Sequence, residues 1–204
     1  YRGMWFLKIA FLGMFLAAGC SQAAITIYTD RNAWRTAAGG SRVFLVDFNN
    51  YTTDVAASAP LNVGPFTLTP NGSWDMPLID SAQSGFNNTS FDGTAGVTMR
   101  AFFGVSLLVN FQSSVGSFGF DLADSFGGGR PGSILTSAGD SYDFVAHTGG
   151  TGFIGLVSTA PFTSVTFSSI SNVRPLIDNF EANSAVPEPS AGALLTLGAG
   201  VLAA

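Results

Sequence analysis

The sequence predicts an all-β protein, a single β-sandwich or jelly-roll-like domain with one short helix near its start. Three observations support this prediction. Apolar residues alternate with Ser, Thr, Asn and Gly through most of the middle of the chain. Turn-forming clusters such as Pro70-Asn71-Gly72 and Gly127-Gly128-Gly129 separate these segments. The sequence also lacks the long segments of period 3.6 that a helix bundle or a βαβ fold requires.

A short helix is the first predicted element. Thr29 or Asp30 can accept hydrogen bonds from the free amide groups of its first turn. The pair Gly39-Gly40 can end it, because glycine readily adopts the left-handed conformation found after helices. Its apolar stripe consists of Ala33, Trp34, Ala37 and Ala38. We therefore expect Trp34 to lie in the core.

About nine short strands are predicted after this helix. The alternation is clearest in residues 97–103, 105–111 and 118–122, where apolar side chains occupy every second position. Further candidates are residues 43–48, 66–69, 142–146, 153–157, 163–167 and 177–182. Each strand would bury Phe and Val on one face and expose Ser, Thr and Asn on the other, as in sandwiches and jelly rolls.

The composition excludes several classes of protein. Only 21 of the 204 residues are charged, against 50 Ser, Thr and Asn, and the formal net charge is −5. Seven Arg and one Lys cannot form the basic surface that nucleic acid requires. One Cys and one His exclude a disulfide framework and a zinc site built on cysteine or a histidine cluster. The 19 Phe can bury enough surface to exclude intrinsic disorder.

Residues 1–23 have the pattern of a secretory signal peptide. Arg2 and Lys8 form its positive region, and residues 9–18 form its apolar region. Ser21 and Ala23 are small enough for the specificity pockets of signal peptidase, which predicts cleavage after residue 23 or 24. An alternative stays open, in which residues 16–20 form a lipobox and Cys20 is lipidated.

The C-terminal segment, residues 186–204, combines a Pro-Glu-Pro motif with an apolar run. Pro187 and Pro189 keep Glu188 in an extended, accessible conformation. The uncharged residues 191–204 would form a helix of about 21 Å, which is shorter than the ~30 Å hydrocarbon core of a bilayer. We interpret them as the first part of a transmembrane helix.

This segment resembles the PEP-CTERM sorting signal of exported proteins in Gram-negative bacteria. The resemblance implies that an exosortase, a membrane-embedded processing enzyme, recognises Pro187, Glu188 and Pro189. The terminal basic cluster of such signals is not present here. Residues 24–185, with segments such as 25–40, 118–129 and 165–180, are similar to the exported β-sandwich domains that precede these tails. That second resemblance implies a fold and adds little about activity.

Acidic side chains are the first candidates for chemistry. Asp121 and Asp124, Asp140 and Asp143, and Asp178 could converge at sheet edges and hold a structural calcium ion through carboxylate oxygens. Aspartates that cap turns or face solvent are the simpler interpretation, so no metal ligand is assigned. Asp121 and Asp178 are the two to test first. Glycosidase chemistry needs a pair of carboxyl groups, but Glu181 is the only Glu of the domain, and we predict no enzyme.

Other candidates are weaker. His147 lies in a polar, glycine-rich stretch, and residues 149–152 lack the lysine of a phosphate-binding loop. Aromatic rings that could stack on sugars are Trp34, Trp74, Tyr51 and Tyr142.

The sequence therefore predicts a secreted, non-catalytic protein. Its precursor would be anchored in the inner membrane and then sorted by the exosortase to the cell surface or to the exopolysaccharide matrix of a biofilm. The main alternative is a carbohydrate-binding module, with or without calcium. An ice-binding protein, suggested by Thr67-Leu68-Thr69, and a glycoside hydrolase are less favoured.

Overall fold

The computed structural model describes residues 24–39, 41–72, 77–81, 95–98, 105–124, 131–145, 151–169 and 175–185. The predicted signal peptide, Cys20, the predicted sorting motif Pro187-Glu188-Pro189 and the apolar residues 191–204 lie outside this part of the chain, as do Trp74, His147, Gly149 and Gly150. The side chain of Asp124 is not described either. Within the described residues, no helix is long and apolar enough to cross a membrane.

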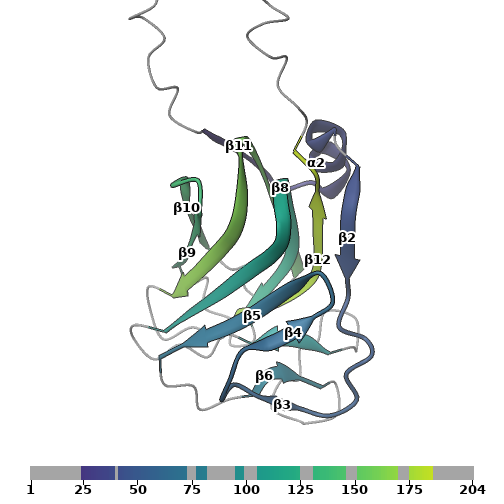
Figure 1. Ribbon diagram of the computed structural model, residues 1–204, viewed down its shortest axis with the longest axis vertical. Coiled ribbons are helices and arrows are strands. Elements are labelled where there is room, and N and C mark those ends of the chain that lie inside the picture. The colour runs from purple at the N-terminus through teal and green to yellow at the C-terminus, as the bar shows by residue number, and fades with distance from the viewer. Residues whose placement is uncertain are drawn as a thin grey trace, which may run out of the picture.

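The described chain is mostly β-structure with one short helix, and the predicted fold class, a β-sandwich, is confirmed (Figure 1). The elements are β1 (Ile25–Tyr28), α2 (Arg31–Ala38), β2 (Arg42–Val46), β3 (Val55–Ala56), β4 (Leu61–Val63), β5 (Phe66–Asn71), β6 (Pro77–Asp80), β7 (Gly96–Thr98), β8 (Ser106–Asp124), β9 (Pro131–Thr136), β10 (Ser141–Val145), β11 (Thr151–Ser169) and β12 (Pro175–Asn183).

Two layers share the long strands β8 and β11, which curve from one layer into the other (Figure 1). The first layer has the order β1–β11–β8–β12–β2 and uses residues 151–157 of β11 with residues 117–123 of β8. The second layer has the order β10–β9–β11–β8–β5–β4 and uses the other halves of the two long strands. Strands β7, β6 and β3 continue from β12.

The two long strands correct the sequence prediction. Two predicted strands, residues 105–111 and 118–122, are parts of β8, which begins at Ser106, and two others, residues 153–157 and 163–167, are parts of β11. In β8 the buried positions change from odd-numbered residues, such as Val109, to even-numbered ones, such as Phe120. In β11 the register shifts between Val157 and Ser164, and there the buried positions change from even-numbered to odd-numbered residues. A bulge lets a strand change face while its ladder continues, so a break in the alternation marks a bend here and not a strand end.

Short strands account for the other differences. The sequence did not predict β1, β3, β4, β6 or β9, because each is too short or too irregular to show an alternating pattern. Strand β5 also continues through Pro70 and Asn71, which the sequence assigned to a turn. Of the predicted strand 97–103, the structure describes only residues 97 and 98, which belong to β7.

The core between the layers is rich in phenylalanine. The Phe118 ring lies 5.3 Å from that of Phe180 and 5.7 Å from that of Phe120, measured between centroids. Phe44 and Phe66 continue the cluster at 5.2 Å. Edge-to-face and tilted arrangements of this kind are favourable beyond the burial of apolar area. The cluster holds the two layers together across their full width.

Helix α2 covers the outer face of the first layer and has the predicted ends. Asp30 is its N-cap, and the carboxylate Oδ1 accepts a hydrogen bond of 2.7 Å from the amide of Ala33. Gly39 follows the helix with φ 60°, in the left-handed region. The prediction for Trp34 is also confirmed, since it is fully buried, and its indole Nε1 donates to the carbonyl of Leu156 at 3.1 Å. A Cβ on Gly155 would overlap the Trp34 ring, so this packing requires glycine.

Candidate functional site

Two of the acids considered as calcium ligands, Asp121 and Asp178, lie side by side on the first layer. Asp121 of β8 and Asp178 of β12 are directly opposite each other in the register. Asp121 accepts 2.8 Å and 2.9 Å hydrogen bonds from Arg31 Nη2 and Asn179 Nδ2. Asp178 accepts a 2.6 Å bond from the amide of Asn179. The structure thus brings the two acids together but surrounds them with donors of this chain.

Glu181 is the centre of this cluster, and the sequence did not single it out for such a role. It is 2% exposed and lies on the outer face of β12, because a bulge at Asn179 (φ 51°) shifts the register before it. Arg35 Nη2 and Arg31 Nη1 donate to Glu181 Oε2 at 2.7 Å and 3.1 Å. The hydrogen bond with Glu181 raises the pKa of Arg35 above its ordinary value. These contacts tie helix α2 to the sheet.

Asp140 and Asp143 do not join the cluster. Asp140 is buried at the turn between β9 and β10, and it accepts a hydrogen bond of 3.0 Å from Ser158 Oγ. Asp143 lies exposed on β10. Among the described residues, no group of three or more His, Cys, Asp or Glu side chains is placed to hold a metal ion. The calcium hypothesis therefore has no support from this part of the chain.

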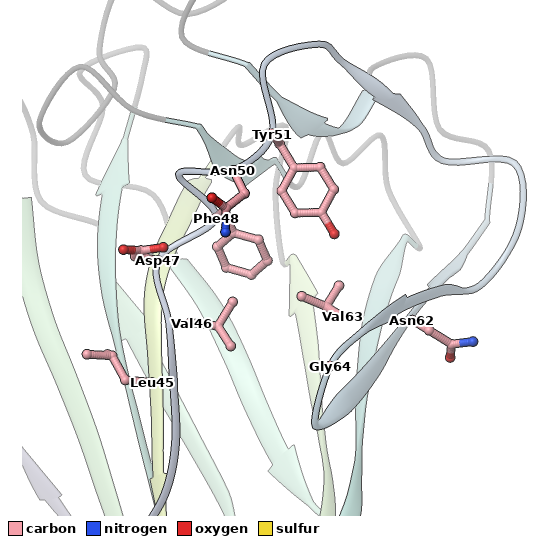
Figure 2. A pocket seen from close by; sticks show the side chains of 9 residues that line it. All are labelled: Leu45, Val46, Asp47, Phe48, Asn50, Tyr51, Asn62, Val63 and Gly64. Atoms are coloured by element: carbon pink, nitrogen blue, oxygen red, sulfur yellow. The ribbon is translucent and has the colours of Figure 1, made fainter.

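A pocket of about 350 Å³ lies between the end of β2 and β4, at one edge of the sandwich. Figure 2 shows the side chains of Phe48, Tyr51 and Val63 directed into the space between these two segments, whereas Asn62 points away from them. The residues that line it are Leu45, Val46, Asp47, Phe48, Asn50, Tyr51, Asn62, Val63 and Gly64. None of these nine residues is basic.

The wall that follows β2 is shaped by a tight turn. Asp47 accepts hydrogen bonds from the backbone and side-chain nitrogens of Asn49, at 3.2 Å and 3.0 Å. Phe48 has φ 55°, a left-handed conformation that is uncommon outside glycine and is found preferentially at functional sites. The amide of Tyr51 then donates to the Phe48 carbonyl at 3.0 Å. This turn anchors the Phe48 ring against Phe180, at 5.2 Å, and holds Tyr51 over the pocket.

The opposite wall is held equally firmly. Gly64 has φ 56°, and its carbonyl accepts a hydrogen bond of 2.7 Å from Gln112 Nε2 of β8. Asn62 Oδ1 accepts one of 2.7 Å from Thr67 Oγ1 of β5. The pocket is therefore formed by the fold itself and needs no ligand to create it. An aromatic ring with a hydroxyl group, an apolar floor and amide groups at the rim suit a small polar, uncharged ligand.

The aromatic candidates fall into two groups. Tyr51 is half-buried and lines the pocket, so it is the ring best placed to contact a ligand. Tyr142 is half-buried against the core from β10, and Trp34 is buried under α2. Phe48, Asn50 and Asn62 were not predicted as site residues. The one sequence signal near them is the presence of Asp47, Asn49 and Asn50 directly after a strand, which is typical of a turn.

No protein-family model and no curated protein matches the sequence. Solved structures similar to this chain include a CBM35 module from Cellvibrio japonicus Abf62, with a TM-score of 0.41 and 16% identity over 70% of this chain and 94% of that one. A point mutant of CBM29-2, complexed with mannohexaose, has a TM-score of 0.39 and 13% identity over 65% and 91%. A family 29 carbohydrate-binding module has a TM-score of 0.37 and 16% identity over 59% and 90%.

Proposed function

We propose that this β-sandwich is a non-catalytic, carbohydrate-binding domain of an exported protein, and that it binds a neutral sugar unit of exopolysaccharide in the pocket beside Tyr51. The observation that carries the proposal is the half-buried ring of Tyr51 over a preformed pocket without basic residues. Sugar rings have apolar C–H faces that stack on aromatic rings, and hydroxyl groups that bond to amides such as those of Asn50.

The acidic cluster supports a role without catalysis. Glycoside hydrolysis needs two carboxyl groups that flank a bond of the substrate, one of them able to donate a proton. Asp121 and Glu181 are instead both bonded to Arg31, and Glu181 is buried beneath helix α2. The carboxylates of the cluster are thus engaged by arginines of α2 and attach that helix to the sheet.

Export and sorting belong to the same proposal and rest on the sequence. Residues 1–23 would direct secretion, and an exosortase would process the precursor near Pro187, Glu188 and Pro189. The domain would then reach the cell surface or the extracellular matrix of a Gram-negative bacterium. There, a module that binds polysaccharide would hold the protein in place.

Replacement of Tyr51 by alanine tests the pocket. We expect Tyr51→Ala to weaken binding to a soluble neutral polysaccharide about tenfold or more, because it removes the ring that covers the pocket. Affinity electrophoresis in gels containing galactomannan or hydroxyethyl cellulose measures the change. Tyr142→Ala is the matched control, since it removes a half-buried tyrosine at the core from β10, outside the pocket.

Thermal unfolding of both variants identifies any loss of folded protein. Equal affinity of Tyr51→Ala and wild type would exclude the pocket as the binding site. Addition of EDTA to the same gels separates calcium-assisted binding from binding without metal, and we expect no change.

Replacement of Pro187 and Glu188 by alanine tests the sorting. We expect the double variant to accumulate as an unprocessed membrane species in cells that contain an exosortase, because the extended recognition element is lost. Immunoblots of membrane and medium fractions measure this. Ser190→Ala, next to the motif, is the control, and normal processing of the double variant would contradict the proposal.

A further inference from the structure

The outer face of the second layer carries three rows of aligned side chains. Each row follows from the pairing of neighbouring strands: the first runs from β4 to β11, and the other two run from β5 to β10. The rows are Asn62–Thr67–Asn110–Ser164, then Thr69–Leu108–Thr166–Leu135–Ser141, and finally Asn71–Ser106–Ser168–Ser133–Asp143. All fourteen side chains are exposed or half-exposed. We call this surface the hydroxyl face.

The hydroxyl face is almost free of charge. Eleven of its fourteen residues are Ser, Thr or Asn, and Asp143, at the end of one row, is the single charged member. Solvent-facing strands usually carry charged residues that keep a surface hydrated and its edges unpaired. A protein with 21 charged residues in 204 has placed one of them here. The face is therefore about as poor in charge as the whole chain, and its polar groups are almost all uncharged.

The dimensions fit a polymer better than a single small molecule. Strands are spaced about 4.8 Å apart, so a row of five strands extends for about 19 Å, and successive rows are about 7 Å apart. In the middle row, Leu108 and Leu135 alternate with the hydroxyl groups of Thr69, Thr166 and Ser141. Leu135 is 49% exposed. Alternating apolar and hydroxyl groups match a pyranose chain, whose rings present C–H faces and whose hydroxyl groups point sideways.

The hydroxyl face borders the pocket at β4, the edge strand of this layer. Asn62 of β4 adjoins the pocket, but its side chain points away from it (Figure 2) and begins the first row, where it accepts a hydrogen bond of 2.7 Å from Thr67 Oγ1. A chain with one unit at the pocket would pass over the edge of β4 and then extend along the rows toward β10. The absence of basic residues among the fourteen gives no attraction for a polyanion, whereas a neutral chain loses no electrostatic free energy on this surface.

We propose that the hydroxyl face binds an extended, neutral polysaccharide chain laid across the strands. This inference rests on the proposed carbohydrate-binding function and identifies the polymer class and the surface that would bind it. The bound chain would make its main contacts with the middle row, centred on Thr166.

A charged double variant in the middle row provides the test. In Thr166→Glu/Leu135→Glu, two carboxylates replace a hydroxyl and an apolar contact, and a bound chain would have to desolvate them. The matched controls are Thr26→Glu, at an exposed position of β1 outside this surface, and Tyr51→Ala in the pocket. The probes are microcrystalline cellulose, insoluble mannan and the polyanion alginate, and co-sedimentation measures binding.

We expect the wild type and Thr26→Glu to sediment with a neutral polysaccharide and not with alginate, and the double variant to lose at least tenfold in affinity. Wild-type affinity of the double variant, with binding lost in Tyr51→Ala, would overturn this inference and leave the proposed function standing. Failure of the wild type to bind any neutral polysaccharide would contradict both. The wild type could instead show thermal hysteresis, or a dimer in sedimentation velocity, that Thr26→Glu keeps and the double variant lacks. Such a result would assign the surface to ice or to a second copy of the chain, and it would overturn the inference.

Discussion

Glu181 attaches helix α2 to the outer side of the first layer. It is 2% exposed, and two arginines of helix α2 donate to it. A carboxylate in such a position is stable only while its partners remain, because burial without them leaves a charge that neither water nor protein solvates. Its partners are 22% and 43% exposed, so they would regain water if the carboxylate were lost. The cluster therefore has a structural role, as an attachment between helix and sheet.

We expect Glu181→Ala to lower the free energy of unfolding by about 3 kcal/mol, near the lower end of the range for breaking a buried ion pair. Urea unfolding followed by tryptophan fluorescence measures it. Arg42→Ala is the control, since Arg42 is 56% exposed and lies 3.9 Å from Glu181, and such a pair contributes less than about 1 kcal/mol. Equal losses in the two variants would show that Glu181 does not attach the helix.

Helix α2 is the element whose ends and buried face the sequence specifies most clearly. Its eight residues have a cap at each end and bury Trp34 and Ala38 on one face. A helix of two turns is not stable alone in water, so its packing on β8 and β11 must supply most of its stability. The caps add to this by satisfying backbone groups that the short helix leaves free.

Removal of the N-cap tests this contribution. We expect Asp30→Ala to lower the free energy of unfolding by about 1 kcal/mol, because the Ala33 amide loses its acceptor. Asp30→Asn keeps a side-chain acceptor and should remain within a few tenths of a kcal/mol of the wild type. Chemical denaturation of the two variants side by side gives the comparison. A loss in Asp30→Asn equal to that in Asp30→Ala would mean that the charge matters and the cap does not.

Two outer surfaces of the molecule differ in the charged residues that they carry. The first layer carries Asp121, Glu181 and the arginines that neutralise them, beneath and around α2. The outer face of the second layer carries Ser, Thr and Asn with one charged residue. The first surface is therefore held by ion pairs, whereas the second, where we propose that a polymer binds, presents almost only uncharged groups.

This division predicts how binding depends on salt. We expect affinity for a neutral polysaccharide to change less than about twofold between roughly 50 mM and 500 mM sodium chloride, because screening acts on charges and the proposed contacts involve almost none. Co-sedimentation at several salt concentrations measures it. An affinity that falls steeply with salt would show that charged contacts dominate and would contradict a binding surface of hydroxyl and amide groups.

Particular residues show how far the sequence could predict the fold and the site. Asp30 and Gly39 act at the ends of one helix, and the sequence predicts their roles correctly. The sequence also predicts that Trp34 is buried, but not that it bonds to Leu156 of β11. The sequence suggested that Asp121 and Asp178 could converge with other acids at a sheet edge, but it could not show that Arg31 and Asn179 would donate hydrogen bonds to them. The pocket combines Phe48 and Tyr51 with Val63 and Gly64, and no local pattern connects these two segments.

Alternation, capping and composition are local properties of the chain, so the all-β class, the capped helix and the low charge could be predicted before any contact was known. The export and sorting segments at both ends are predictions of the same kind. Three features required the folded structure: β8 and β11 run through both layers, Glu181 lies beneath α2, and Ser, Thr and Asn from separate strands align into one face. These features depend on register and bulges, which are set by hydrogen bonds between distant strands, and a shift of one residue would turn each of these side chains to the other side of the sheet.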